Sequence, residues 1–453
     1  MQAATADHRP LLLPRGQAEC SDIGQLVENV LAYDAETEAT IRLIPTEGLM
    51  SPLQKAMYLS VQNERYLHAP PEHHDKAIRY PDIGRLQTIY EICRRASCRV
   101  LGAEYVIIDF LSGLQCMSIC IEAFSKAGDL ILSIDPANGG HEATRSIVEQ
   151  LGRAASWLPF DPTAHVVNTI RLDPCLEPAL VYFDHSNILH PHDVAAVKKC
   201  YPGATVMFDA SQVMALVAGR QFPNPLNEGA DVMIGTTHKS LNGPQKAIAA
   251  TNSVRLHRQL RTQCMRFISN NHPSSIAALA VCFLEFEQFG ASYAKQLVAN
   301  ANALSLALSN EGVAVYECRS PGGDDWRTHT QHVWIDCARM GWGAEDAVRE
   351  LYSNGIVVNT LFLARGGPDG SGARGLRLGT TEVTRLGMRK EEMTSIAQAI
   401  ASCLLGRNKR PSVRASIDGL RRRFRRVDYC YDYPDHRILM TASQEGTDGS
   451  EEE

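Results

Sequence analysis

The 453-residue sequence has no stretch that approaches the roughly 20 consecutive apolar residues a membrane helix needs. Its first twenty residues hold one run of three leucines between prolines, without the apolar core of a secretory signal. Basic residues are not in excess, with 45 Lys and Arg against 51 Asp and Glu. General nucleic-acid binding is therefore not expected. These absences predict a cytoplasmic protein that binds neither membrane nor nucleic acid.

Motifs for metal binding are also lacking. The 13 cysteines include no pair of CxxC motifs, and several lie in apolar helical patterns, where free cysteine acts as a small hydrophobe. Two histidine-rich stretches, "PPEHHDK" and "HSNILHPHD", lack the ligand spacing of a metal-binding helix. The sequence predicts buried, reduced thiols and no metal.

Short apolar, β-branched runs recur through the middle of the chain. They occupy residues 105–110, 130–134, 179–183, 205–209 and 232–236. Helical patterns separate most of them, for example 84–102 and 114–127. Strands of this kind that alternate with helices are typical of a parallel sheet covered on both faces. We therefore expect an α/β fold with three layers (α/β/α) and a mainly parallel sheet.

The composition of the chain changes at both ends of this region. We expect an N-terminal helical arm over 1–50, a large domain over 51–315 and a smaller C-terminal α+β domain over 316–406. The remaining 407–453 form a tail with a basic "RRRFRR" run and an acidic end that we expect to be disordered.

Four polar groups follow predicted strands, where ligands bind to an open parallel sheet. Asp209 ends one strand, Lys239 follows another, Ser112 and Gly113 begin a helix, and His141 lies in "ANGGH". A lysine can form a Schiff base with an aldehyde, and a carboxylate can keep a pyridine nitrogen protonated. A helix start offers N–H groups to a phosphate. Together these groups suit pyridoxal phosphate.

Longer motifs then resemble the serine hydroxymethyltransferase family of fold-type-I pyridoxal-phosphate transferases, over roughly residues 40–405. "GTTHKSLNGPQ" is similar to the family's run around the Schiff-base lysine. "LIPTEGLMSP", "VLGAEY", "SGLQ", "GGHEATR" and "GLRLGTTEVTRLGM" are similar to further family segments.

The resemblance implies a role for each matching residue. Lys239 would form the Schiff base, Asp209 would pair with the pyridine nitrogen, and His141 would stack on the ring. Other implied cofactor contacts are Ser112, Gly113, Ser186, Gln212 and Thr236. Arg377 would bind the substrate carboxylate through its guanidinium fork, with Thr46 also in the substrate site, and Tyr66 and His238 would be catalytic beside Lys239. Tyr66 would reach the partner's cofactor in a homodimer, and Asn270 to His272 would lie on the partner's phosphate, although the family's glycines are missing there.

Three departures from the family pattern bear on function. A glutamate follows the family's tyrosine by two residues, whereas here the stretch reads Tyr66-Leu67-His68. Gln212 replaces a histidine, and Leu114 replaces a phosphate-binding serine. The changed stretch indicates that folate is not the carbon carrier. His68 is a candidate base, because an imidazole titrates near neutral pH.

Several segments also resemble the L-threonine transaldolases of specialised metabolism, such as those of antibiotic biosynthesis: "THKSLNGPQK", "FDHS", "EFEQFGASYAKQLVANA" and "TRLGMRKEEM". That resemblance implies cleavage of threonine and addition of the glycine carbanion to another aldehyde, giving a β-hydroxy-α-amino acid. Alternatives are folate-dependent hydroxymethyl transfer and other pyridoxal reactions, namely aldol cleavage, β-elimination or decarboxylation. A non-catalytic protein that binds nucleic acid through the basic tail is a further alternative.

Overall fold

The computed structural model describes residues 21–67, 83–318, 323, 327–366, 372–407 and 410–433. The α-helices are α1 (Ser21–Glu38), α2 (Pro52–Tyr58), α3 (Gly84–Leu101), α4 (Gly113–Phe124), α5 (Thr144–Gln150), α6 (Val194–Cys200), α7 (Met214–Ala218), α8 (Val254–Phe267), α9 (Pro273–Asn310), α10 (Ala344–Ser353), α11 (Thr381–Arg385), α12 (Lys390–Leu404) and α13 (Arg410–Arg423). The short 3-10 helices are η1 (Val61–Glu64), η2 (Pro136–Asn138), η3 (Thr169–Arg171) and η4 (Ala338–Met340). The strands are β1 (Ile41–Arg42), β2 (Tyr105–Ile107), β3 (Leu130–Ser133), β4 (Ala154–Trp157), β5 (Phe160–Asp161), β6 (Val166–Val167), β7 (Leu180–Phe183), β8 (Thr205–Asp209), β9 (Val232–Thr236), β10 (Ala247–Thr251), β11 (His332–Ile335), β12 (Ile356–Val357), β13 (Asn359–Gly366) and β14 (Gly372–Gly379).

The largest sheet confirms the predicted, mainly parallel α/β architecture. Within the described residues it has the strand order β2-β10-β9-β8-β7-β3-β4. Every neighbouring pair is parallel except those of β10, which runs antiparallel to β2 and β9. The parallel strands β7, β8 and β9 therefore end at one edge, which places Asp209 and Thr236 side by side in space.

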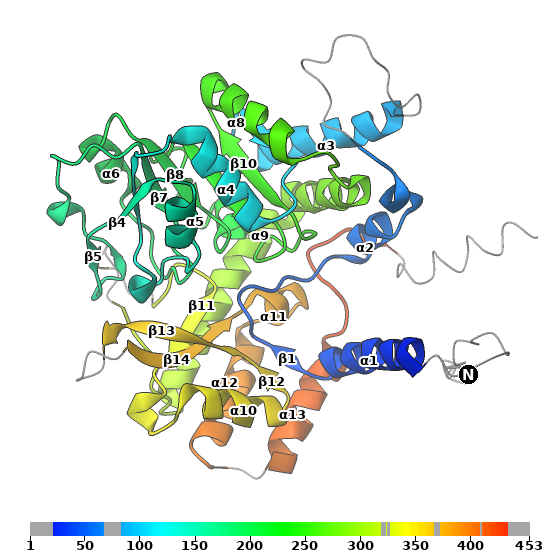
Figure 1. Ribbon diagram of the computed structural model, residues 1–453. Coiled ribbons are helices and arrows are strands. Elements are labelled where there is room, and N and C mark those ends of the chain that lie inside the picture. Colours follow the sequence, from blue (N-terminus) through cyan, green and yellow to red (C-terminus); the bar gives the residue numbers. More distant parts are fainter. Residues whose placement is uncertain are drawn as a thin grey trace, which may run out of the picture.

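Helices cover both faces of this sheet (Figure 1). Along β7, Val181 and Phe183 lie in a core shared with α3 and α9, whereas Leu180 and Tyr182 lie in a core shared with α4 and α8. This alternation follows from the two-residue period of a strand. Both faces are apolar because both are covered, which explains the near-continuous apolar runs in the sequence.

A second core lies in the C-terminal part of the chain. The antiparallel sheet β11-β14-β13 packs with α10 and α12, shown in yellow and orange in Figure 1. Residues 313–317 ("VAVYE"), which precede this sheet in the chain, form no strand of their own and make one isolated β-bridge, from Val315 to Ile335. Ile41 and Leu43 lie in this same core, because β1 pairs in parallel with β12. The N-terminal segment is thus joined to the C-terminal part of the fold.

The helix α9 contributes to both cores. Phe283 and Phe286 pack under the large sheet, and Leu304 and Leu308 pack in the C-terminal core. By length and composition α9 is apolar enough to cross a membrane, but 67% of its most apolar window is buried inside the fold. Its apolar character is accounted for by its place between the two cores.

After α13 the chain returns to α9 and α11. The Tyr429 carbonyl accepts a 2.7 Å hydrogen bond from Arg385 Nη1, and the Tyr431 hydroxyl donates to the Leu284 carbonyl at 3.2 Å. Arg385 also forms an ion pair with Glu285 at 2.8 Å, and both side chains are 1% exposed. A buried ion pair therefore joins α9, α11 and the C-terminal segment.

Candidate functional site

Asp209 is fixed at the end of β8 by two neighbours. The Tyr182 hydroxyl donates to its Oδ2 at 3.0 Å, and the Ser211 backbone N–H donates to its Oδ1 at 2.8 Å. Burial, with the Asp209 carboxylate, raises the pKa of Tyr182 well above its usual value, so the phenol stays a donor. The carboxylate is thus oriented by donors that leave its charge in place, as a partner of a protonated ring nitrogen requires.

Lys239 lies in a tightly held loop after β9. The Asn242 backbone N–H donates to the Lys239 carbonyl at 3.0 Å, and the Asn242 side-chain oxygen accepts from Leu49 N–H at 2.9 Å. A Cβ at Gly48 would lie 2.3 Å from the Lys239 carbonyl oxygen, so the N-terminal segment packs directly on the loop. Thr46 lies in that segment, beside Pro45, against which Gly379 packs. The loop and the predicted Thr46 position are therefore held together.

Electrostatics place Lys239, Asp209 and Arg377 in one site. Burial lowers the pKa of the Lys239 ammonium, the Asp209 carboxylate opposes this, and Arg377 adds to it. Burial also lowers the pKa of Arg377 to about 10, so the guanidinium keeps its charge at neutral pH. The site thus combines an amine that is more easily deprotonated with a fixed positive charge nearby.

The end of β9, at Thr236, and the start of α4, at Gly113, lie in close contact. A Cβ at Gly113 would lie 2.6 Å from Thr236 Cγ2, so only glycine permits this approach. Thr236 Oγ1 is buried and has no hydrogen-bond partner among the described residues. Ser112 caps α4 by accepting from the Gln115 N–H at 3.3 Å. An orphaned hydroxyl beside the N-terminus of a helix fits a phosphate group.

His141 and His238 lie near the same charges. Burial lowers the pKa of His141, and Asp209 and Lys239 act on it in opposite directions. The Asp184 carboxylate accepts from the His141 backbone N–H at 3.3 Å. Burial, with a smaller effect of Lys239, lowers the pKa of His238 to about 4, so its ring is neutral. The sequence-predicted neighbours of the lysine are therefore brought together in space.

Ser186 and Gln212 occupy loops at the same edge of the sheet. The Ser186 N–H donates to the Gly139 carbonyl at 2.8 Å, which places Ser186 beside the loop that leads to His141. Gln212 is buried, and its Oε1 lies 3.3 Å from His332 Nε2. His332 was not predicted from the sequence. Burial is the largest cause that lowers the pKa of His332. The positive charges of Arg377 and Lys239 lower this pKa further, which places His332 near both side chains.

Arg377 has amide partners that sequence reasoning also missed. Its Nη1 donates to Asn187 Oδ1 at 2.9 Å. The Asn359 side-chain amide is oriented so that both its nitrogen and its oxygen form hydrogen bonds. In this orientation its oxygen accepts a hydrogen bond from Arg377 Nη2 at 2.7 Å. Asn187 directly follows Ser186 in "FDHSN", which is the signal that could have identified it. Asn359 and His332 come from separate strands and carry no comparable local signal.

The Tyr66-Leu67-His68 stretch is only partly within the described residues. Tyr66 is 39% exposed, and His68 lies outside the described residues, as does the rest of 68–82. The Leu67 N–H donates to Asn270 Oδ1 at 3.0 Å, and the Asn271 N–H donates to the Leu67 carbonyl at 2.8 Å. The 270–272 loop therefore holds this stretch within the same chain.

The match to a family model decides the class of the protein. Residues 22–400 match the model described as serine hydroxymethyltransferase. The chain belongs to the serine hydroxymethyltransferase family. It is a pyridoxal-phosphate-dependent enzyme of the fold-type-I transferases, as its sheet and the motifs around Lys239 predicted.

Relatives within and beside this family were found by sequence and by structure. Serine hydroxymethyltransferase from Methanopyrus kandleri is 31% identical, over 90% of this chain and 95% of the relative. Fluorothreonine transaldolase from Streptantibioticus cattleyicolor is 30% identical, over 89% of this chain and 63% of the relative. The crystal structure of L-threonine transaldolase from Pseudomonas fluorescens in the internal aldimine state superposes with a TM-score of 0.83 at 25% identity, covering 94% and 98% of the two chains.

The residues of this serine hydroxymethyltransferase-family chain fit the cofactor. The orphaned Thr236 hydroxyl and Gly113 at the start of α4 suit its phosphate, and the oriented Asp209 suits its ring nitrogen. Lys239 is the amine that would bind its aldehyde. When bound, pyridoxal phosphate supplies an electron sink for negative charge at the substrate Cα.

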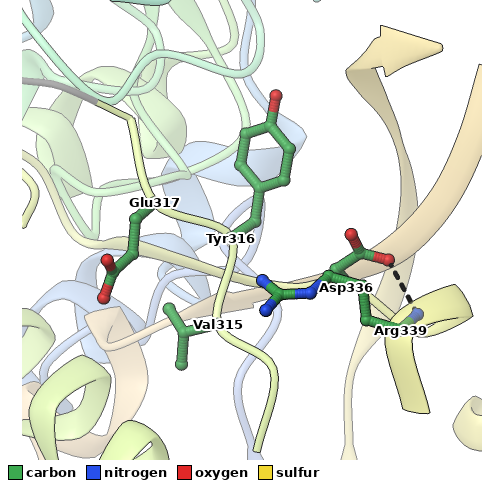
Figure 2. A pocket seen from close by; sticks show the side chains of 5 residues that line it. All are labelled: Val315, Tyr316, Glu317, Asp336 and Arg339. Atoms are coloured by element: carbon green, nitrogen blue, oxygen red, sulfur yellow. Dashed lines mark hydrogen bonds between the residues drawn. The ribbon is translucent and has the colours of Figure 1, made fainter. Parts of the chain in front are cut away.

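A separate pocket lies in the C-terminal part of the fold. Figure 2 shows its lining side chains, which include Tyr316, Glu317, Asp336 and Arg339, around a cavity of about 310 Å³. The Arg339 backbone N–H donates to Asp336 Oδ1 at 3.3 Å. None of the predicted site residues lines this pocket, so it is distinct from the Lys239 site.

The histidines of "HSNILHPHD" (residues 185–193) contact one another and the backbone. His185 Nδ1 lies 2.9 Å from His192 Nε2, and His192 Nδ1 accepts from the Val167 N–H at 3.1 Å. Among the described residues, no group of three or more His, Cys, Asp or Glu side chains is arranged to hold a metal ion.

Proposed function

We propose that this protein is an enzyme of the L-threonine transaldolase type, acting in specialised metabolism. It would break the Cα–Cβ bond of threonine, release acetaldehyde, and join the remaining glycine unit to a second aldehyde. The product would be a β-hydroxy-α-amino acid. The observation that carries the proposal is that an amine, Lys239, and a charged guanidinium, Arg377, lie in one buried site with an oriented carboxylate, Asp209.

Each residue of the site has a task in this proposal. Arg377 binds the amino-acid carboxylate, because a planar guanidinium matches a carboxylate with two donors. Lys239 and Asp209 would hold the cofactor through its aldehyde and its ring nitrogen, and His141 would contact its ring. His68 accepts the proton of the threonine β-hydroxyl, for which an imidazole is suited near neutral pH.

The remaining predicted residues line the same pocket. Ser112, Gly113 and Thr236 would hold the cofactor phosphate. Ser186, Gln212, His238 and Thr46 would form the walls around it, and the close approach of Gly113 to Thr236 supports the assignment of the phosphate to the start of α4.

Two features favour this type over folate-dependent hydroxymethyl transfer. The likeness to L-threonine transaldolase extends over 94% of this chain and 98% of that one. The Tyr66-Leu67-His68 stretch also has a histidine where the hydroxymethyltransferases have a glutamate. Folate-dependent hydroxymethyl transfer is the second candidate function, because several relatives, such as that from Methanopyrus kandleri, carry the hydroxymethyltransferase name.

We also propose a homodimer with shared sites. Tyr66 is 39% exposed, and α1 exposes apolar side chains, among them Leu26 at 62% and Leu31 at 56%. Exposed apolar groups on one helix are typical of a surface that is covered in an assembly. A mass in solution that corresponds to one chain, with full activity, would contradict the dimer.

The transaldolase proposal is tested with donors and acceptors. Threonine alone should release acetaldehyde, and threonine with an aromatic or sugar-derived aldehyde should give a new amino acid, detected by mass. Tetrahydrofolate should change neither result. Efficient turnover of serine with tetrahydrofolate, without any product from threonine and aldehydes, would replace the proposal with hydroxymethyl transfer.

A further inference from the structure

The partners of Arg377 are neutral. Asn187 Oδ1 accepts from Nη1 at 2.9 Å, and the Asn359 oxygen accepts from Nη2 at 2.7 Å. Burial is the sole cause of the lowered pKa of Arg377, with no acidic group of the described residues opposing it. The guanidinium is therefore oriented by two amides that leave its full positive charge available.

The backbone of Asn187 is fixed by a contact with His165. Its backbone carbonyl lies 3.0 Å from His165 Nε2, and burial lowers the pKa of His165 to about 3. The ring is therefore neutral, and its one N–H donates to the carbonyl. A Cβ at Gly139 would lie 3.0 Å from Asn187 Cβ, so the 185–187 loop packs closely on the loop before His141.

The same histidine contacts the strand pair that carries Arg377. The His165 ring meets the Trp334 ring edge to face, with centroids 4.8 Å apart. Trp334 of β11 lies directly opposite Arg377 of β14 in the antiparallel register. Asn187, in the loop after β7 of the large sheet, therefore contacts Arg377 from one side, with His165 of the β5–β6 hairpin behind it, while Asn359 contacts Arg377 from β13 of the small sheet.

We propose that Asn187 is a positioning residue for the substrate carboxylate: its amide oxygen fixes the guanidinium of Arg377 without neutralising it. The inference rests on the proposed role of Arg377 in binding an amino-acid carboxylate. An aspartate at position 187 would occupy the same space and accept the same hydrogen bond. It would also pair with Arg377 and compete with the incoming carboxylate, since a charged acceptor binds a guanidinium more strongly than an amide does.

The test compares two ligands that differ by the carboxylate. Glycine and methylamine both present an amine, and only glycine presents a carboxylate, so binding of each to the holoenzyme is followed through the cofactor absorbance. Asn187→Asp should weaken glycine binding about 10- to 100-fold, the fold-change that corresponds to a hydrogen bond with a charged group. Methylamine binding should change by less than about twofold, because it does not use Arg377.

Two further variants complete the design. Asn252→Asp is the matched control, because Asn252 is exposed and its Oδ1 accepts from the Glu104 N–H at 3.0 Å, a bond that aspartate retains. It should bind both ligands as the wild type does. Asn187→Ala removes the hydrogen bond without adding charge and should weaken glycine binding about 2- to 10-fold. If circular dichroism shows that Asn187→Asp does not fold, glycine and methylamine binding to Asn187→Ala tests the inference instead.

The outcomes separate this inference from the proposed function. Equal loss of glycine and methylamine binding would show general damage to the site and overturn the positioning role, as would unchanged glycine binding in both Asn187 variants. Such results would leave threonine cleavage by the wild type untouched. A wild-type holoenzyme that binds no amino acid would instead overturn the proposed function and this inference together.

Discussion

Replacement of Arg385 by methionine tests how much of the fold depends on the buried ion pair with Glu285. The Arg385 Nη2–Glu285 Oε2 distance is 2.8 Å, and each side chain is 1% exposed. Methionine leaves the Glu285 charge buried, with Gln54 Nε2 as its remaining donor at 2.9 Å. Removing one partner of such a pair costs about 3–5 kcal/mol of the free energy of unfolding.

The double variant Arg385→Met with Glu285→Gln sharpens this prediction. Glutamine keeps an oxygen for Gln54 and removes the uncompensated charge. The two substitutions should therefore be non-additive, with the double variant about 1–3 kcal/mol more stable than the sum of the single losses. This coupling separates the loss of charge pairing from the loss of packing around the methionine.

The assay is urea unfolding of the holoenzyme, followed by tryptophan fluorescence and by far-ultraviolet circular dichroism. Coincident transitions justify extracting a free energy. Arg349→Met is the surface control, because Arg349 pairs with Asp346 at 72% and 63% side-chain exposure. Its loss should cost at most about 0.5 kcal/mol. If Arg385→Met is no more destabilising than Arg349→Met, the buried pair does not join these elements as described.

Three further predictions concern the site and its surroundings. Lys239→Ala should purify without the visible cofactor absorption of the wild type, because the amine that would bind the cofactor aldehyde is removed; Lys126→Ala, at an exposed position, should keep it. Gly48→Ala should weaken cofactor affinity at least about tenfold, since its Cβ would lie 2.3 Å from the Lys239 carbonyl oxygen and the loop must shift. Burial raises the pKa of Glu382 to about 7. The folded state thus binds this proton more tightly than the unfolded state, and stability falls as pH rises from about 4.5 through 7. Glu382→Gln should flatten that part of the pH profile.

Controls for the last two predictions come from the same chain. A Cβ at Gly24 meets no atom within 4 Å, so Gly24→Ala in α1 should leave cofactor affinity unchanged. For Glu382, the quantity compared is the difference in the free energy of unfolding between variant and wild type at each pH. A difference that is constant between pH 4.5 and 8 would show that Glu382 titrates alike in both states.

Strands β7, β8 and β9 could be predicted because their residues are apolar on both faces, a pattern that depends only on the local sequence. Strand β10, "AIAAT", was missed, since alanine has little strand preference and its place is set by β2 and β9 on either side. The full length of α9 was missed for a similar reason. Its two halves belong to different cores, and its exposure pattern changes along its length.

For the candidate site, the residues near the lysine could be identified because they lie in motifs. Lys239, Asp209, His141 and Arg377 are predicted to act together, and the electrostatic effects among them place them in one site. Asn359 and His332 could not be found in this way. Each is a common polar residue on a strand, and its contact with the site exists only after the two sheets have packed.

The pairing of β1 with β12 has a consequence for synthesis of the protein on the ribosome. Ile41 pairs with Ile356, and Leu49 accepts from Arg385 through its carbonyl at 3.4 Å. At about 5–20 residues per second, roughly 15–60 s separate the emergence of the two strands. During that interval the large sheet and the Lys239 loop can form, and the segment with Gly48 can contact that loop, while β1 still lacks its partner strand β12. The wall of the site beside Lys239 is therefore fixed on both sides only after β12 and α11 have been synthesised, so ribosomal stalling before residue 356 should damage the site more than the sheet.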